Sequence, residues 1–143
     1  MQLSIRSESL QGMQSIQCTD SGLSWTIDEP VSMGGTNLGP NPLEAVLGAW
    51  AGCLSIVIRM VCQENGWPIG PVAVHASGEF DPRGFMGIPG VSPYFSTAEA
   101  TVEVSQLDAS WVEPLTQSAE SRCPVSGLLR AAGVHTSIAI QPK

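Results

Sequence analysis

Hydrophobic and polar positions alternate in several short segments of the chain. The alternation is clean over Leu23, Trp25 and Ile27, and it recurs over residues 72–80 and 97–105. A period of two predicts half-buried β-strands. Weaker alternation over residues 3–18 and 134–140 adds further strands at the two ends, so the pattern predicts short strands on both sides of a central helical segment.

The central segment is an apolar run that predicts one long helix. Asn41 is a good N-cap, Pro42 suits the first helical position, and Glu44 completes a capping-box pattern. Gly66 is a natural stop. Because the middle of the run is apolar on every side, we expect the helix to be buried all round. Its apolar stretch of residues 45–58 is shorter than the roughly 20 residues that span a membrane, so we expect a soluble protein.

Two small residues on this helix admit two interpretations. Gly48 and Gly52 lie four positions apart and would allow close backbone approach. The neighbour is either a symmetry-related helix or a sheet of the same chain.

The rest of the chain predicts an α+β domain. Residues 29–41 and 81–95 are rich in Gly and Pro and predict loops. A second helix is expected from a Ser110 cap to about Arg122, followed by a short helix after Cys123-Pro124. The expected order is βββ–α–ββ–α–α–β, with antiparallel hairpins, in a single domain over residues 1–143.

Composition narrows the possible partners. The 143 residues carry a net charge of -7, and only 13% of them are charged. Nucleic-acid binding and docking on an anionic membrane are therefore not expected. So few charges also indicate that a second subunit covers part of the surface. No export signal is visible, which favours a cytoplasmic location, and neither histidine lies near a cysteine, so no metal site is expected.

Four cysteines are the candidates for chemistry. Cys123 precedes a proline that begins a helical turn, so its sulfur would face the helix N–H groups that favour thiolate, with Arg122 adjacent. Cys53 taken alone reads as a core cysteine, and Cys62 should face the opposite side of the same helix. Cys18 is expected to be an exposed spectator. The acids at 28–29 read as a solvated turn rather than a general-acid pair.

Three motifs together resemble those of one family. They are DEPVSMGGTNLGPNPLEAVLGAWAGCL at 28–54, DPRGFMGIPGVSPYF at 81–95 and SRCPVSGLL at 121–129. Their order and spacing are similar to those of the OsmC/Ohr family, the osmotically induced and organic-hydroperoxide-resistance proteins of the oxidative stress response. The resemblance covers the chain from end to end and lies closest to the OsmC-like branch.

The resemblance implies a fold, an assembly and a reaction. It implies an intertwined homodimer with sheets around a buried central helix. It also implies a thiol peroxidase in which Cys53 attacks an organic hydroperoxide and becomes a sulfenic acid. Cys123 then closes a disulfide that a lipoyl-type dithiol reduces, with no cofactor. This order differs from the local argument, which favours Cys123 as the more activated thiol.

The chain departs from the family pattern at the residues that polarise the peroxide. Directly after Pro42 the family peroxidases place a Glu, whereas this chain has Leu43 and then Glu44. The family peroxidases also place an Arg upstream, which with the Glu polarises the peroxide and holds the thiolate. The candidates for this role are Arg6, Arg122 and Glu44, or a residue of the partner chain, or the stabilising Arg is absent.

Two functions follow. One is the organic-hydroperoxide peroxidase, with an apolar substrate pocket expected from four large side chains: Trp50, Phe85, Met86 and Tyr94. The alternative is a non-catalytic OsmC-like protein that binds a small molecule or senses redox state.

Overall fold

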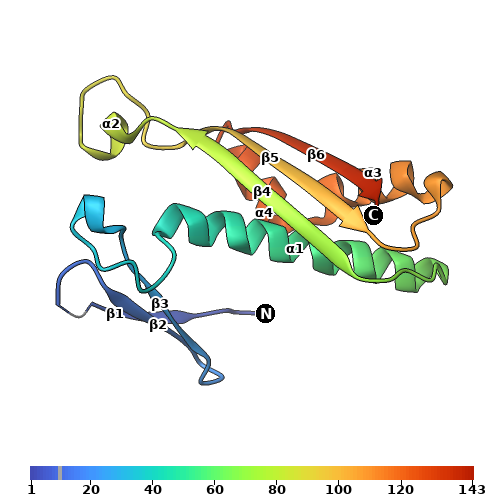
Figure 1. The fold of residues 1–143 in the computed structure, drawn as a ribbon, viewed down its shortest axis with the longest axis horizontal. Helices are drawn as coiled ribbons and strands as arrows, with labels where there is room; N and C mark the ends of the chain where they lie inside the picture. Colours follow the sequence, from blue (N-terminus) through green and yellow to red (C-terminus); the bar gives the residue numbers. More distant parts are fainter. Residues whose placement is uncertain (10) are drawn as a thin grey trace. The chain divides into compact units, whose positions relative to one another are not determined.

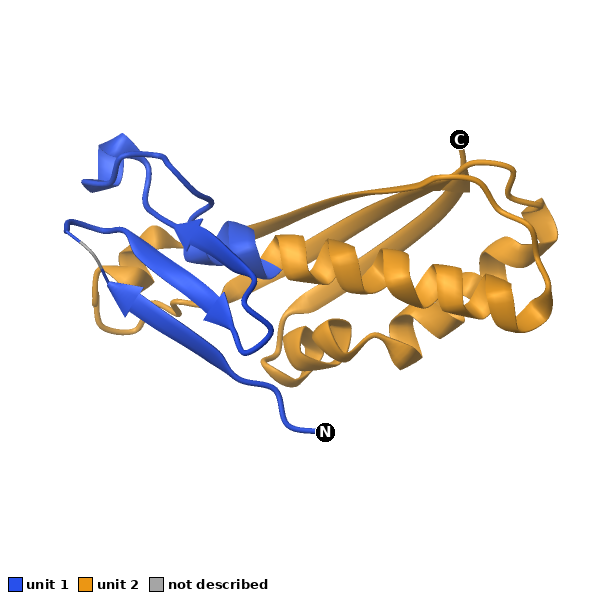
Figure 2. Cartoon of the chain, turned by 90° about the horizontal axis from the view of Figure 1, so that it is seen from below, with its two compact units in different colours: residues 1–46 blue, residues 47–143 orange. Residues whose placement is uncertain are grey.

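The computed structural model describes residues 1–9 and 11–143, and these form two compact units. The first unit is Met1–Val46 and the second is Leu47–Lys143 (Figure 2). Each unit contains its own three-stranded sheet. One domain over residues 1–143 remains a prediction.

The first unit is built on an antiparallel sheet of consecutive strands. Its strands are β1 (Ile5–Ser9), β2 (Ser15–Thr19) and β3 (Ser24–Ile27), paired in the order β1-β2-β3 (Figure 1). The turn between β2 and β3 closes with a hydrogen bond from the Gly22 amide to the Thr19 carbonyl. This confirms three strands in the segment before the long helix.

A single buried carboxylate organises the loop after β3. Asp28 is 1% exposed, and its oxygens accept hydrogen bonds from the amides of Glu29, Thr36 and Leu38 and from the Thr36 hydroxyl. These bonds, the Thr36 hydroxyl first, lower the pKa of Asp28 to about 2. The expectation that Asp28 lies in a solvated turn is therefore wrong, because the loop folds back and supplies backbone donors. A short 3₁₀ turn, η1 (Val31–Met33), lies within it.

The second unit contains a mixed sheet rather than a purely antiparallel one. β4 (Val72–Phe80) pairs antiparallel with β5 (Phe95–Val104), whereas β6 (His135–Pro142) pairs parallel with β5. A parallel neighbour needs a crossover connection. Here two helices, α3 (Val112–Arg122) and α4 (Pro124–Ala131), make that crossover. The expected antiparallel pairing therefore holds for every strand pair except β5–β6.

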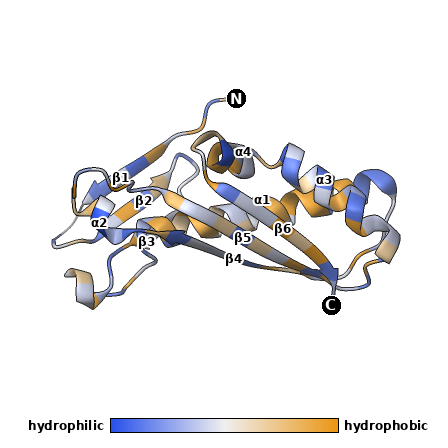
Figure 3. Ribbon diagram, turned by 90° about the horizontal axis from the view of Figure 1, so that it is seen from above, coloured by the Kyte–Doolittle hydropathy of each residue, from blue (hydrophilic) through white to orange (hydrophobic). Residues whose placement is uncertain are grey.

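The core of the second unit lies on one face of this sheet. Val74, Val102 and Ile140 are in register across the three strands, and the alternate positions of β5 are buried as their period predicts. The helices lie over this face of the sheet (Figures 1 and 2). On the opposite face, polar residues such as Thr101 are exposed. Hydrophobic and hydrophilic segments lie side by side along α3, as expected for a helix with one buried side (Figure 3).

The long helix begins and ends where the sequence predicts. α1 spans Pro42–Asn65, and Asn41 and Glu44 exchange two hydrogen bonds of 2.8 Å in a capping box. Gly66 follows at φ 68°, the left-handed conformation that glycine adopts readily at a helix end.

Burial of α1 is one-sided within the chain. The buried side chains lie along one face: Trp50, Leu54, Val57, Ile58, Val61 and Cys62. Ile56 and Met60 on the other face are 58% and 47% exposed. The expectation of burial all round is therefore wrong for a single chain, because one sheet and its helices cover only one side. Among the described residues, α1 alone is long and apolar enough to cross a membrane, a property it shares with core helices of soluble proteins.

The remaining helical segments refine the predicted boundaries. A short helix, α2 (Pro82–Phe85), begins the expected 81–95 loop, with Asp81 as its cap. Before α3, Asp108 rather than Ser110 provides the cap, accepting from the Ser110 amide at the start of the 3₁₀ turn η2 (Ala109–Trp111). Asp at position 108 is the better acceptor because its charge favours the helix N-terminus. Apart from α2 and the 3₁₀ turns, the order βββ–α–ββ–α–α–β is confirmed.

Candidate functional site

Two cysteines from distant parts of the second unit lie in contact. Cys53 lies in the middle of α1, and Cys123 lies at the junction of α3 and α4. Their sulfur atoms are 2.7 Å apart and share a hydrogen bond, although 70 positions separate the residues. Both are free thiols. The structure therefore brings together the pair that the family resemblance implies.

Local backbone geometry places the Cys123 sulfur at a helix start. Cys123 is the N-cap of α4, Pro124 is the first helical residue, and the sulfur accepts a hydrogen bond of 3.4 Å from the Ser126 amide. This confirms the predicted cap. The first turn of a helix has free N–H groups and positive dipole character, and both stabilise a thiolate.

The two thiols differ in acidity. Burial, followed by the hydrogen bond with Cys123, raises the pKa of Cys53. Burial alone would also raise the pKa of Cys123, but hydrogen bonds with Cys53, the Ser126 hydroxyl and the amides of Val125 and Ser126 lower it overall. In this geometry the negative charge of the pair therefore belongs on Cys123.

Cys53 is the more accessible of the two thiols. A cavity of about 610 Å³ opens beside Cys53 and is lined mainly by apolar groups: Ala49, Gly52, Cys53, Ile56, Val57, Met60, Arg122 and Pro124. Cys123 is only 2% exposed and does not line it. A molecule that enters this cavity therefore meets the sulfur of Cys53 first.

One cation borders this cavity, and it is already paired. The Arg122 guanidinium donates two hydrogen bonds to the Glu64 carboxylate, of 2.6 and 2.8 Å. This pair joins the end of α3 to the last turn of α1. Of the expected thiolate-stabilising residues, Arg122 thus lies at the cavity, with its charge directed to Glu64.

The other two candidates have partners in the first unit. The Glu44 carboxylate accepts from the Asn41 amide and so caps α1. Arg6 is exposed on β1 and lies 3.5 Å from Glu8. A role for either residue in stabilising a thiolate remains a prediction.

The four residues expected to form a substrate pocket occupy two different environments. Trp50 is fully buried, and its indole donates a 2.8 Å hydrogen bond to Ser126. Phe85, Met86 and Tyr94 are 64–68% exposed in the segment from α2 to β5. In the described part of the single chain, none of these four side chains lines the cavity beside Cys53.

Sequence reasoning missed Ser126. It is fully buried, its hydroxyl accepts a hydrogen bond from the Trp50 indole, and its backbone amide donates to the Cys123 sulfur. The available signal was its place three residues after the N-cap, where a backbone amide faces the capping side chain.

The two remaining cysteines lie elsewhere. Cys62 is buried on the opposite side of α1 from the cavity, as predicted, and burial raises the pKa of its thiol. Cys18 is half-buried in β2, so the expectation of an exposed residue is wrong. Over residues 1–9 and 11–143, no group of three or more potential metal ligands occurs.

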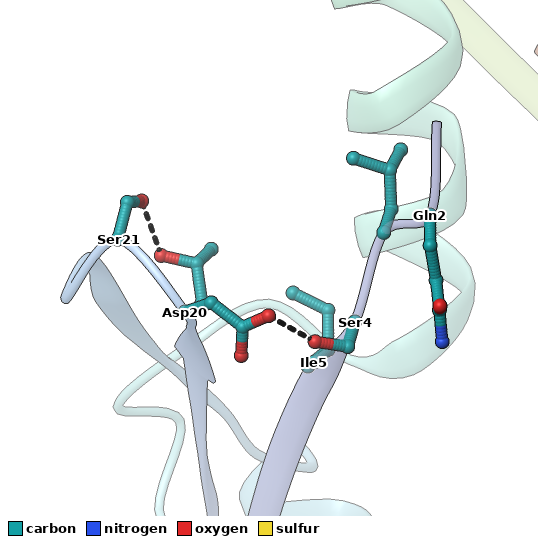
Figure 4. A pocket seen from close by; sticks show the side chains of 7 residues that line it. Gln2, Ser4, Ile5, Asp20 and Ser21 are labelled. Atoms are coloured by element: carbon teal, nitrogen blue, oxygen red, sulfur yellow. Dashed lines mark hydrogen bonds between the residues drawn. The ribbon is translucent and has the colours of Figure 1, made fainter.

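Another cavity, of about 530 Å³, lies in the first unit and has no cysteine or histidine among its lining residues: Gln2, Leu3, Ser4, Ile5, Thr19, Asp20 and Ser21. Two hydrogen bonds occupy its polar groups, one from Ser4 to Asp20 and one between Thr19 and Ser21 (Figure 4). It therefore offers neither a thiol nor an imidazole.

Solved structures share this fold over nearly the whole chain. An OsmC-like protein from Mycoplasma pneumoniae matches with a TM-score of 0.81 at 14% identity, covering 99% of this chain and 97% of the other. The organic hydroperoxide resistance protein OsmC from Legionella pneumophila matches with 0.76 at 17%, covering 99% and 97%. The organic hydroperoxide resistance protein OhrB of Bacillus subtilis matches with 0.64 at 20%, covering 99% and 98%.

Sequence comparison gives the family directly. No curated protein sequence matches the chain. The family model described as OsmC-like protein matches residues 35–139, a span that includes both cysteines in contact and the crossover that carries Cys123. With the shared fold, this match shows that the chain belongs to the OsmC-like protein family.

Proposed function

We propose that this protein is a two-cysteine peroxidase that reduces organic hydroperoxides. The observation that carries the proposal is the 2.7 Å separation of the Cys53 and Cys123 sulfurs beside an apolar cavity. Hydroperoxide-resistance proteins of the same fold support it. An apolar cavity also favours an organic hydroperoxide over hydrogen peroxide, because burying the hydrocarbon group of the organic hydroperoxide lowers the free energy of binding.

The first step oxidises Cys53. As Cys53 attacks, its proton moves to the Cys123 thiolate, and the Cys53 sulfur bonds to the terminal peroxide oxygen. The O–O bond breaks, Cys53 becomes a sulfenic acid, and the alkoxide takes the proton from Cys123 and leaves as an alcohol. Access from the cavity is the reason that Cys53 reacts first.

The second step forms the disulfide. The Cys123 thiolate attacks the sulfur of the Cys53 sulfenic acid and expels hydroxide, which takes a proton from solvent and becomes water. A dithiol of the lipoyl type then reduces the disulfide to two thiols and is itself oxidised to a cyclic disulfide. No cofactor enters the cycle.

The proposed setting is a cytoplasmic homodimer that acts in the response to oxidative stress, without nucleic-acid or membrane partners. The exposed apolar side of α1, with Gly52, Ile56 and Met60, fits a second copy of the chain. The glycines Gly48 and Gly52 have nothing within 4 Å of an added Cβ within the chain, so a partner backbone could approach closely there.

A second function is favoured by one observation. Arg122, the cation at the cavity, is bound bidentately by Glu64, which leaves its charge compensated. A chain that has lost the peroxide-polarising pair would bind a small molecule or sense redox state without turnover.

Thiol counting with single-cysteine variants separates the two functions. In the peroxidase, one equivalent of an organic hydroperoxide removes two thiols, and a dithiol restores both. Cys53→Ser abolishes peroxide consumption. Cys123→Ser performs one slower turnover and accumulates sulfenic acid at Cys53. Cys62→Ser is the matched control on the same helix and keeps full turnover.

Two other outcomes of this experiment would contradict the proposal. Consumption that survives in Cys53→Ser but not in Cys123→Ser would make Cys123 the attacking thiol. Consumption unchanged in both variants, or absent in the wild type, would favour the binding or sensing protein.

A further inference from the structure

The charged groups at the cavity beside Cys53 compensate one another. Among the residues described, Arg122 is the one charged residue that lines this cavity, and the rest of the lining is apolar apart from the Cys53 thiol. The Arg122 guanidinium donates hydrogen bonds of 2.6 and 2.8 Å to the two oxygens of the Glu64 carboxylate. Glu64 itself lies outside the described lining. The cavity therefore has one cation, and a carboxylate next to the cavity neutralises it.

This ion pair occupies the groups that a carboxylate ligand needs. A guanidinium binds a carboxylate best through two parallel N–H···O bonds, and Glu64 already accepts both from Arg122. The hydrogen bond with Arg122 also holds the pKa of the Glu64 carboxyl below its usual value, so Glu64 is ionised at neutral pH. Because Glu64 belongs to the same folded chain, its local concentration beside Arg122 exceeds that of a dilute ligand. An entering carboxylate therefore finds the guanidinium already bound.

The thiol pair adds a second negative charge when it ionises. The sulfur atoms of Cys53 and Cys123 are in contact, so a thiolate on either one lies at the reacting end of the cavity. With the Glu64 carboxylate, two negative charges then face one guanidinium. The net charge of the chain, -7, repels anions at longer range as well. An anion that enters the cavity thus loses its hydration without gaining a free cation.

We infer that Glu64 is a specificity-determining residue, which keeps carboxylate-bearing molecules from Cys53 and makes uncharged organic hydroperoxides the substrate class. The substrate class rests on the proposed peroxidase, whereas the exclusion of anions does not. An uncharged alkyl or aryl hydroperoxide gains from burial against Ile56, Val57 and Met60 and loses no hydrated charge.

The direct test compares a neutral and an anionic reagent at the Cys53 thiol. Iodoacetamide and iodoacetate have nearly the same size, and both alkylate a thiolate with loss of iodide, but only iodoacetate is charged. Their rates at Cys53 in the reduced protein are followed by peptide mass spectrometry, and the ratio of the rates is divided by the ratio for 2-mercaptoethanol. A change in the pKa of Cys53 affects both reagents equally and cancels in this ratio. The wild type should favour iodoacetamide by about threefold.

Two variants of the same ion pair should move this ratio in opposite directions. Glu64→Gln keeps the shape of the side chain but frees the charge of Arg122, so the ratio should shift toward iodoacetate by about three- to fivefold. Arg122→Gln leaves Glu64 uncompensated and should shift the ratio further toward iodoacetamide. Both variants break one ion pair, so a purely structural role would shift the ratio in the same direction in both.

A matched control makes the same change in net charge elsewhere. Glu103 on β5 lies 3.9 Å from Lys143 and does not line the described cavity. Glu103→Gln should leave the ratio of the two alkylation rates unchanged. High salt gives a measurement that needs no variant, because screening should weaken the preference of the wild type for iodoacetamide.

Three results would overturn the inference. They are a ratio in Glu64→Gln equal to that of the wild type, a wild-type preference that persists in high salt, and a Cys53 thiol that neither reagent modifies. The last result would mean that the cavity admits no solute.

Turnover tests the substrate class separately. Cumene hydroperoxide and its ring-carboxylated analogue differ by one carboxylate. In the wild type kcat/KM should favour cumene hydroperoxide by about threefold, and Glu64→Gln should remove the difference by lowering KM for the analogue. A wild-type preference for the analogue would overturn the inference. If neither compound is consumed, the peroxidase proposal fails, while the alkylation rates still decide whether Glu64 excludes anions.

Discussion

At the scale of single residues, Asp28 makes the stability of its loop depend on acid. Its pKa falls from 3.8 to about 2 on folding, mainly through the Thr36 hydroxyl. Because the pKa of Asp28 is lower in the folded protein than in the unfolded chain, its ionised carboxylate stabilises the folded state. This stabilisation is complete above about pH 4 and is lost as the pH falls toward 2. Asp28→Asn should lower the melting temperature at pH 7 and flatten the decline between pH 4 and 2. Melting curves across this range test it, and a parallel decline in both proteins would contradict it.

Gly35, in the same loop, must be a glycine because of a close contact and not because of its backbone conformation. A Cβ at Gly35 would lie 1.8 Å from the Glu29 carbonyl oxygen and 2.8 Å from Asp28. Gly35→Ala should therefore destabilise the protein by about 1–3 kcal/mol, measured by denaturant unfolding. The control Gly127→Ala, on α4 with nothing within 4 Å, should be neutral or stabilising. Equal effects of the two substitutions would refute the contact argument.

At the scale of elements, the Arg122–Glu64 pair ties the end of α3 to α1. The pair is bidentate, but its side chains are 40% and 50% exposed. A double-mutant cycle with Arg122→Gln and Glu64→Gln should give a coupling of at most about 1 kcal/mol, because solvent screens exposed charges. The coupling should shrink in high salt. A coupling of several kcal/mol, insensitive to salt, would mean that the pair is buried by something else, such as a partner chain.

The boundaries of the elements were predictable because they depend on signals between neighbouring residues. Features that depend on contacts between distant residues were not predictable from the sequence pattern. The capping residues act on neighbours within four positions, so their roles could be predicted from the sequence; they are Asn41, Glu44, Gly66 and Cys123. Asp28 was misread because its donors come from residues up to ten positions later in an irregular loop.

The candidate site depended still more on distant contacts. The Cys53–Cys123 contact spans 70 positions and the Arg122–Glu64 pair spans 58. Periodicity contains no information at such separations. The cysteine pairing was predictable through the family resemblance, and the ion pair was not predicted at all.

At the scale of the whole molecule, one apolar side of α1 predicts self-association. Light scattering should give about twice the 15.0 kDa chain mass. Ile56→Arg places a charge on the 58% exposed apolar position and should lower the mass toward that of one chain. Thr101→Arg, on the exposed face of the second sheet, is the control and should remain dimeric. A stable wild-type monomer at micromolar concentration would contradict the proposed homodimer.

The parallel pairing of β5 with β6 also decides when during folding the two thiols first meet. Because Cys123 lies between α3 and α4 in this crossover, 70 positions after Cys53, the two thiols meet only when that long loop closes. Closing so long a loop is slow compared with forming hairpins or helices. A newly made chain therefore passes through a period in which its four cysteines are unprotected and any two can be oxidised together. The disulfide formation proposed for the folded protein is, for the unfolded chain, a route to misfolding, because there any two cysteines can pair.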